Sequence, residues 1–177
     1  MKTLSVPVGP DDHSLGPTDA PITLVEYGSY DCPHCRKALS ILDGLRDHYG
    51  ERLRLVYRHY PNETPQSESD RAAQAAEAAA SQGSFWEMHA HLLQNQSALD
   101  DASLIAYATI LGLDTQRFAA ELADGVYADK VRGQFESGRE SGVLSTPTFF
   151  INGVRHDDFW DLETLTVAID SAMDRSK

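Results

Sequence analysis

The sequence predicts an α/β fold in which a mixed central sheet of about four or five strands is flanked by helices and interrupted by an inserted all-helical block. Two observations support this. The first half of the chain contains two strand-like segments separated by a helical one, and such a pair forms a parallel, right-handed crossover. After a long helical stretch, strand character returns with Asn152-Gly153, which is typical of an antiparallel hairpin.

The first half of the chain has clear strand and helix patterns. Residues 22–27 are apolar and rich in β-branched side chains, as in a buried strand. A helix is expected to begin at Pro33, to carry apolar residues at helical spacing and to end at Gly50. Residues 52–60 alternate polar and apolar, which predicts the second strand, whereas residues 1–20 are expected to form an extended arm.

The middle of the chain, from about residue 66 to 141, has a helical pattern. Seven alanines lie between positions 72 and 80, which favours a helix strongly. Ser84 and Glu87 have the spacing of a capping box, and Asp114 is a further candidate helix cap. A stretch of this length is too long to be a loop, so we expect an inserted domain.

The end of the chain is expected to complete the sheet domain. Thr148 to Ile151 and Val154 to His156 form the predicted hairpin, and a final helix is capped by Asp161. The predicted organisation is an N-terminal part of the sheet domain at 1–62, a helical domain at 63–142 and a C-terminal part of the sheet domain at 143–177.

Composition restricts the function. The 177 residues contain 15 Lys plus Arg and 27 Asp plus Glu, a net charge of −12, and this argues against nucleic acid as a partner, because its binding depends on cationic side chains. Hydrophobic stretches are too short to cross a bilayer. The first ten residues do not resemble a signal peptide, so we expect a cytoplasmic protein; a periplasmic or secreted protein whose leader was removed is the alternative.

The two cysteines, Cys32 and Cys35, form a C-x-x-C motif at the start of the helix predicted after Pro33. Unpaired N–H groups and the helix dipole stabilise a thiolate at such a position, so the pKa of the Cys32 thiol is expected to fall below the free value of about 8.5. Cys32 is then the attacking sulfur and Cys35 the resolving one. His34 can stabilise the thiolate further when it is protonated.

Structural packing and metal binding are weaker interpretations of the cysteine pair. The cysteines could simply pack in the core, but both of them falling at this spacing by chance is improbable. A metal site would require additional ligands, and His89 and His91, two residues apart on a helix, point to different faces. The pair is therefore interpreted as a redox-active disulfide that needs no organic cofactor and no metal.

The chain resembles the DsbA-like branch of the thioredoxin superfamily over nearly its whole length. The matching segments are 24–31, the motif 32–35, the segment 146–153 and the helical block between the two halves of the fold. The chain is most similar to bacterial DsbA-like proteins that open with the sequence at 16–21, some of which are fused to sodium/proton antiporters.

The resemblance implies a thioredoxin fold with a helical insertion and thiol-disulfide exchange activity. It implies that Pro147 is cis and faces the cysteines, and that Thr146 offers backbone groups to an extended client, with Pro33 also at the client-binding surface. It also places a proton-transfer acid at Glu26, whereas the residues alone leave open an edge strand with Glu26 in water.

The sequence is compatible with three functions. The first is a thiol-disulfide oxidoreductase that acts on cysteines of proteins or peptides, in the direction of an oxidase, a reductase or an isomerase, with an unidentified recycling partner. The second is a kappa-type glutathione transferase or isomerase, although such relatives lack the intact cysteine pair. The third is a thioredoxin-like binding module without enzymatic activity.

Overall fold

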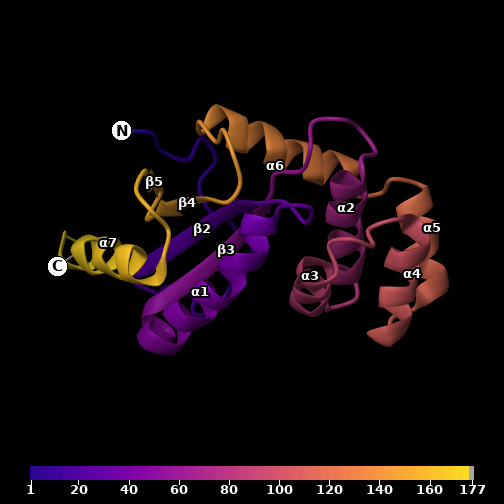
Figure 1. Ribbon diagram of the computed structural model, residues 1–177, viewed down its shortest axis with the longest axis horizontal. Helices are drawn as coiled ribbons and strands as arrows, with labels where there is room; N and C mark the ends of the chain where they lie inside the picture. Colours follow the sequence, from indigo (N-terminus) through magenta and orange to yellow (C-terminus); the bar gives the residue numbers. More distant parts are fainter. Residues whose placement is uncertain (176–177) are drawn as a thin grey trace. The chain divides into compact units, whose positions relative to one another are not determined.

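The computed structural model describes residues 1–175 and contains one five-stranded mixed sheet, whose strand order is β1-β3-β2-β4-β5 (Figure 1). The strands are β1 (His13–Leu15), β2 (Ile22–Gly28), β3 (Leu53–His59), β4 (Thr148–Ile151) and β5 (Val154–Arg155). β1 pairs antiparallel with β3, β2 with β4 and β4 with β5, while β2 and β3 are neighbours connected through a helix. The predicted fold class is therefore confirmed.

The helices follow the order expected from the sequence. They are α1 (Pro33–Tyr49), the short 3-10 helix η1 (Gly50–Arg52), α2 (Glu68–Ala80), α3 (Phe85–Gln94), α4 (Asp101–Ile110), α5 (Thr115–Ala123), α6 (Ala128–Glu140) and α7 (Leu162–Arg175). The insertion between β3 and β4 consists of α2 to α6, as the resemblance implies.

The chain forms two compact units. The sheet unit comprises Met1–Gly28, Lys37–Arg58 and the described residues from 136 onward, and the helical unit comprises Ser29–Arg36 and His59–Phe135. The C-x-x-C motif belongs to the helical unit, and almost all of the sheet belongs to the sheet unit.

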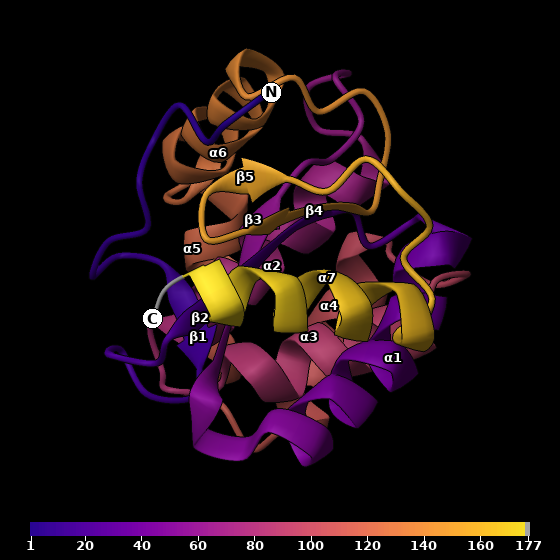
Figure 2. The ribbon, with the colours of Figure 1, turned by 90° about the vertical axis from the view of Figure 1, so that its left-hand side faces the viewer.

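One apolar core lies in the sheet unit, between the sheet and the helices α1 and α7, which lie on the same side of the strands (Figure 2). Alternate residues of a strand point to the same face, so each of the three central strands sends every second side chain into this core. The buried members are Ile22, Leu24, Ala38, Leu45, Tyr49, Leu53, Leu55, Phe149, Ile151, Leu165, Ile169 and Ala172. The members from α1 and those from α7 recur at helical spacing along their own helices, which explains why both helices are amphipathic.

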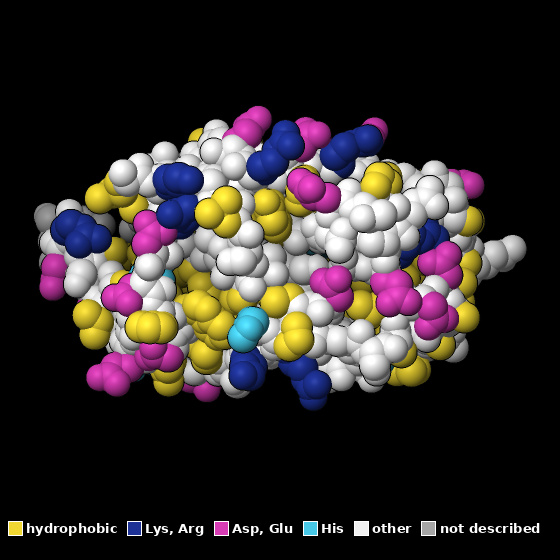
Figure 3. Space-filling model, turned by 45° about the horizontal axis from the view of Figure 1, so that its top comes forward, with side chains coloured by type: hydrophobic (Ala, Val, Ile, Leu, Met, Phe, Trp, Pro, Cys, Tyr) yellow, Lys and Arg dark blue, Asp and Glu magenta, His cyan; other side chains and the backbone are white. Residues whose placement is uncertain are grey.

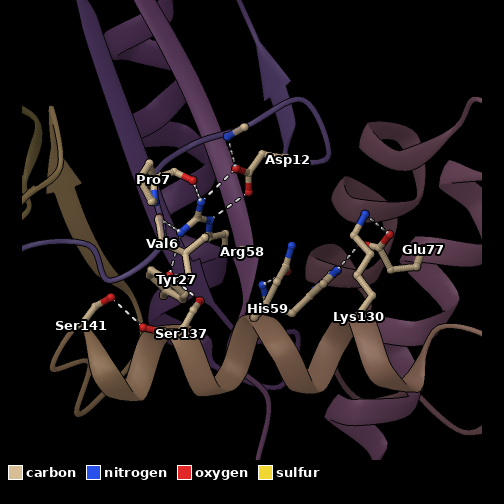
Figure 4. A network of polar contacts seen from close by, with 12 residues as sticks. Val6, Pro7, Asp12, Tyr27, Arg58, His59, Glu77, Lys130, Ser137 and Ser141 are labelled. Carbon is tan, nitrogen blue, oxygen red and sulfur yellow. Dashed lines mark hydrogen bonds and ion pairs between the residues drawn. The ribbon is translucent and has the colours of Figure 1, made fainter.

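The opposite face of the sheet holds a buried arginine. Arg58 is 2% exposed, and its guanidinium donates to both carboxylate oxygens of Asp12, to the carbonyl oxygens of Val6 and Pro7 and to the hydroxyl of Tyr27 (Figure 4). These bonds satisfy every N–H direction of the guanidinium, which makes burial of its charge tolerable. They also fasten the N-terminal arm to β3.

The helical unit is organised around α2, which packs against α3, α4 and α5. The small alanines of α2 are almost all buried, so neighbouring helices can approach its backbone closely. Three helices of the unit have side-chain caps: Ser67 accepts from the N–H of the third residue of α2, and Asp100 and Asp114 do the same for α4 and α5. The cap expected at Asp114 is thus present.

Three details differ from the sequence-based expectations. Residues 1–20 are not only an extended arm, because His13–Leu15 forms the edge strand β1. Ser84 precedes α3 but its side chain makes no cap hydrogen bond, because its backbone (φ −126°, ψ 38°) departs from the extended form usual for a cap, so the capping-box prediction was wrong. Leu162 has the helical spacing that places it on one face with the buried Leu165 and Ile169, yet as the first residue of α7 it is 45% exposed.

The predicted hairpin is present. Asn152 and Gly153 both have positive φ (47° and 82°), as a type I′ turn requires, and they join β4 to β5. The Asn152 side chain also accepts from the N–H of Thr23 at 2.8 Å and donates to the carbonyl of Pro21 at 3.1 Å. The turn therefore also fastens the beginning of β2.

Candidate functional site

Cys32 is the residue that immediately precedes α1, and it is half-exposed. Its carbonyl oxygen accepts the N–H of Arg36 at 3.3 Å, which is the first hydrogen bond of the helix, and its own N–H donates to the carbonyl of Ser29 at 3.3 Å. Cys32 thus occupies the N-cap position, where the N–H groups of the first turn lack helical partners. A negative charge on a side chain at this position is stabilised.

Cys35 lies one turn further into α1 and is only 1% exposed. The N–H of Ser29 donates to its sulfur at 3.5 Å, so the loop before the helix contacts Cys35 directly. Cys32 is half-exposed and Cys35 is buried, and the two residues lie three positions apart on one helical turn. This is the arrangement that an attacking and a resolving cysteine require.

The two residues between the cysteines are both exposed. Pro33 is the first residue of α1, a position where its missing N–H costs nothing. His34 follows it on the same turn, where an imidazolium would add positive charge close to the helix N-terminus. Cys32, Pro33, His34 and Cys35 are thus brought together in one turn of the helical unit.

The loop before the motif is held by α3 and by the turn that follows it. The hydroxyl of Tyr30 lies 3.0 Å from Nδ1 of His89, and both side chains are buried. The side-chain amide of Gln96 donates to the carbonyl oxygen of Cys32 at 2.8 Å. Sequence reasoning missed these contacts, because no motif or periodicity connects residues so far apart in the chain.

Glu26 lies in β2, a central strand of the sheet unit, and is 4% exposed. The alternative in which β2 is an edge strand with Glu26 in water is therefore wrong, because β3 and β4 cover both edges of β2. A Cβ placed on Gly28 would meet the ring of Tyr57 at 2.6 Å and Oε1 of Glu26 at 3.1 Å. Glycine at this position leaves room for the buried carboxylate.

The Thr146–Pro147 peptide bond, also in the sheet unit, is cis, as the resemblance implies. Pro147 is buried and Thr146 is half-buried, directly before β4. A cavity of about 260 Å³ lies beside this bond, lined by residues that include Leu144 and Pro147. Leu144 is 86% exposed, so part of the loop presents apolar surface. Glu26, Thr146 and Pro147 thus belong to the sheet unit and the cysteine motif to the helical unit.

The described residues offer neither a metal centre nor a membrane span. Within residues 1–175, no three His, Cys, Asp or Glu side chains are grouped so that they could hold a metal ion. Over the same range, no helix has the length and apolar character needed to cross a membrane. Figure 3 shows Asp and Glu side chains spread over the visible face with Lys and Arg among them, as on a solvated surface.

Comparison with known proteins identifies the family. A family model described as "Thioredoxin" matches residues 9–171. The chain is 44% identical over 170 residues to "Na(+)/H(+) antiporter NhaA 1" of Salinispora arenicola, an alignment that covers 96% of this chain and 26% of that protein. The chain thus spans about a quarter of the length of the curated relatives it matches.

Solved structures show the same fold. A thioredoxin-like oxidoreductase from Silicibacter pomeroyi superposes with a TM-score of 0.80 at 29% identity, covering 94% of each chain. The alpha-DsbA1 protein of Wolbachia pipientis superposes with a TM-score of 0.83 at 22% identity, covering 98% of this chain and 96% of that one. The protein therefore belongs to the thioredoxin family and has the fold of its DsbA-like members, with a Cys32–Cys35 pair at the start of α1.

Proposed function

We propose that the protein is a thiol-disulfide oxidoreductase that exchanges disulfides with cysteines of proteins or peptides. The observation that supports this most strongly is the division of the cysteine pair into an accessible Cys32 at the helix N-cap and a buried Cys35 one turn later. Membership of the thioredoxin family and the similarity to a thioredoxin-like oxidoreductase support the same chemistry.

The exchange proceeds in two displacements when the dithiol form reduces a client. The thiolate of Cys32 attacks one sulfur of the client disulfide, so a new S–S bond forms while the client S–S bond breaks and the second client sulfur leaves as a thiolate that takes up a proton. Cys35 then loses its proton and attacks the sulfur of Cys32, which releases the first client sulfur. Two electrons pass from the cysteine pair to the client, and the reverse sequence oxidises a client dithiol.

Buried Glu26 is proposed to move the proton of the resolving step. Glu26 is 4% exposed in a central strand, and burial of a carboxylate there costs folding free energy. Buried ionisable groups of this kind cluster at reactive sites. The proposed client-binding residues are Pro33, next to the attacking sulfur, and Thr146 with Pro147, which precede β4 and have backbone groups suited to pairing with an extended segment.

The direction of exchange depends on the reduction potential and the compartment. We propose a cytoplasmic location. The glutathione pool of that compartment has a reduction potential of about −260 mV. A cysteine pair with a reduction potential of about −120 mV would be held there in its dithiol form, in excess over the disulfide by about five powers of ten. Net donation of disulfides would then require a dedicated oxidant. Trapping of the thiol state in fractionated cells that express the natural protein tests the location and the state together.

Reduction of insulin by the dithiol form, and oxidation of a reduced client by the disulfide form, test the function. We expect wild-type protein to catalyse at least one reaction in glutathione buffers, and Cys32→Ser to abolish both. Failure of the wild type at every buffered potential would favour a binding module. Formation of glutathione conjugates that survives Cys32→Ala would favour a kappa-type transferase.

A further inference from the structure

The side chain of Gln96 reaches the backbone of Cys32 from outside the motif's own loop. Its amide nitrogen lies 2.8 Å from the carbonyl oxygen of Cys32, and the two residues are 64 positions apart in the sequence. The same carbonyl accepts the N–H of Arg36 at 3.3 Å. The longer of the two bonds is the helical one, so the Gln96 amide is the closer donor at this oxygen.

The turn that carries Gln96 is fastened at both ends. Asn95 donates from its side chain to the carbonyl of His91 at 2.8 Å, which closes the end of α3, and Tyr107 donates to the carbonyl of Ala98 at 2.7 Å. Leu99, at the end of the turn, is 1% exposed. Gln96 is therefore presented from a short segment with little freedom to move, so the position of its amide is well defined.

We propose that Gln96 is a positioning residue for the attacking cysteine: its amide fixes the orientation of the Cys32 carbonyl and thereby holds the sulfur at the N–H groups of the first turn of α1. This inference rests on the proposed exchange activity and adds a residue of the helical unit to it. Gln96 touches neither sulfur nor client in this role.

The physical reason lies in the N-cap. The backbone angles of this residue decide both where its carbonyl points and where its side chain lies relative to the unpaired N–H groups. A second donor at the Cys32 carbonyl restricts rotation of the peptide unit that follows Cys32. The backbone is then already ordered when the Cys32 thiolate interacts with the N–H groups of the first turn of α1. The amide also brings a partial positive charge to the same end of the helix.

A second contact from the same part of the chain supports this role. His89 of α3 lies within hydrogen-bond distance of the Tyr30 hydroxyl, and Tyr30 is two residues before Cys32. α3 and the turn after it therefore contact the motif and its preceding loop at two points. His89 contacts the side chain of Tyr30, and Gln96 contacts the backbone carbonyl of Cys32. Two such contacts restrain a loop more than either alone.

Gln96→Met and Gln96→Glu test the proposal, with Gln94→Met as the matched control, because Gln94 is exposed and lies two residues earlier on α3. The rate constant for attack of Cys32 on oxidised glutathione is measured at constant pH. Loss of one neutral hydrogen bond predicts a rate about three- to tenfold lower for Gln96→Met. Gln96→Glu is expected to be slower still, since a carboxylate would face the carbonyl, and Gln94→Met should equal the wild type.

If Gln96 only stabilised the fold, its replacement would lower the unfolding temperature but would leave the conformation of Cys32 and its redox equilibrium unchanged. The carbonyl ¹³C shift of Cys32 and the equilibrium constant with glutathione are therefore measured on the same variants, and both should change for Gln96→Met. If Gln96→Met does not fold, Gln96→Ala serves in its place. Rates within twofold of the wild type for folded Gln96 variants would overturn the proposal.

Failure of the exchange activity and failure of the positioning role give different results. If wild-type protein shows no exchange, the proposed function fails whatever Gln96 does. If wild-type protein exchanges and the Gln96 variants match it, only the positioning role fails.

Discussion

The backbone N–H of Ser29 points at the sulfur of Cys35, with 3.5 Å between nitrogen and sulfur. Ser29 also accepts the N–H of Cys32 through its carbonyl, so one residue contacts both members of the cysteine pair. The buried sulfur is thus held by the loop that precedes the accessible one. This arrangement keeps the two sulfurs one helical turn apart and leads to the first prediction.

Replacing Cys35 is expected to stop the exchange after its first step. In Cys35→Ala the mixed disulfide between Cys32 and a client has no resolving thiolate and should accumulate, whereas Cys32→Ala should give none. Non-reducing electrophoresis after mixing with an oxidised client measures this. Equal trapping by both variants would mean that Cys35 is also an accessible nucleophile, contrary to its 1% exposure.

Glu26→Gln is expected to separate stability from activity. Removal of a carboxylate that is 4% exposed should raise the free energy of unfolding by about 1 kcal/mol, because a neutral amide is cheaper to bury. The resolving step should become slower, since its proton acceptor is lost. Urea unfolding and stopped-flow exchange measure the two effects. Lower stability with unchanged exchange would assign Glu26 a structural role.

Gly28→Ala is expected to destabilise the sheet unit. The added methyl group would lie 2.6 Å from Cε2 of Tyr57, a ring buried in the core that cannot move aside easily. Overpacking of this kind costs about 1–3 kcal/mol. Gly133→Ala is the matched control, because Gly133 lies exposed inside α6 with no atom within 4 Å of the added carbon, and alanine should stabilise the helix there by about 0.5–1 kcal/mol. Chemical denaturation of both variants should give changes of opposite sign.

Asp12→Asn tests the buried ion pair with Arg58, whose side chains are 9% and 3% exposed. Burial opposes ionisation of Asp12, but the hydrogen bonds from Arg58 and from the Gly9 N–H outweigh it and lower the pKa of the carboxyl below 3.8. Leaving Arg58 without its counter-ion is expected to cost about 3 kcal/mol at neutral pH.

The pH dependence of this effect has a definite sign. A carboxyl whose pKa is lowered in the folded state stabilises the fold above its unfolded pKa and loses this contribution as the pH falls through the folded pKa. The difference in stability between wild type and Asp12→Asn should therefore be constant above about pH 5 and shrink below pH 4. As a control, Asp129→Asn removes an exposed partner of Arg132 and should leave the stability unchanged. A difference that grows in acid would contradict the assignment.

Local signals predicted most of the fold. The apolar run at β2, the proline at the start of α1, the alanines of α2 and the Asn152-Gly153 turn each specify their conformation within a few residues. Strand β1 was missed because it is three residues long and is a strand only through its pairing with β3. Ser84 carries the cap signal, but its backbone conformation does not allow the cap to form.

The candidate site was predictable only in part, because only its local features leave a signal in the sequence. The spacing of Cys32 and Cys35 and their place before a helix are local, and so is Pro33 at the first helical position. The contacts that hold the loop come from residues about 60 positions away, Gln96 and His89, and no pattern along the chain connects them to the motif. Burial of Glu26 likewise depends on the strands that flank β2.

Titration of the Cys32 thiolate by its ultraviolet absorbance, in the reduced protein with Cys35→Ala as reference, tests the central claim most directly. The N-cap position predicts an apparent pKa clearly below the free-thiol value of about 8.5. A pKa at or above that value would show that the helix N-terminus does not stabilise the thiolate, and the proposed exchange chemistry would lose its physical basis.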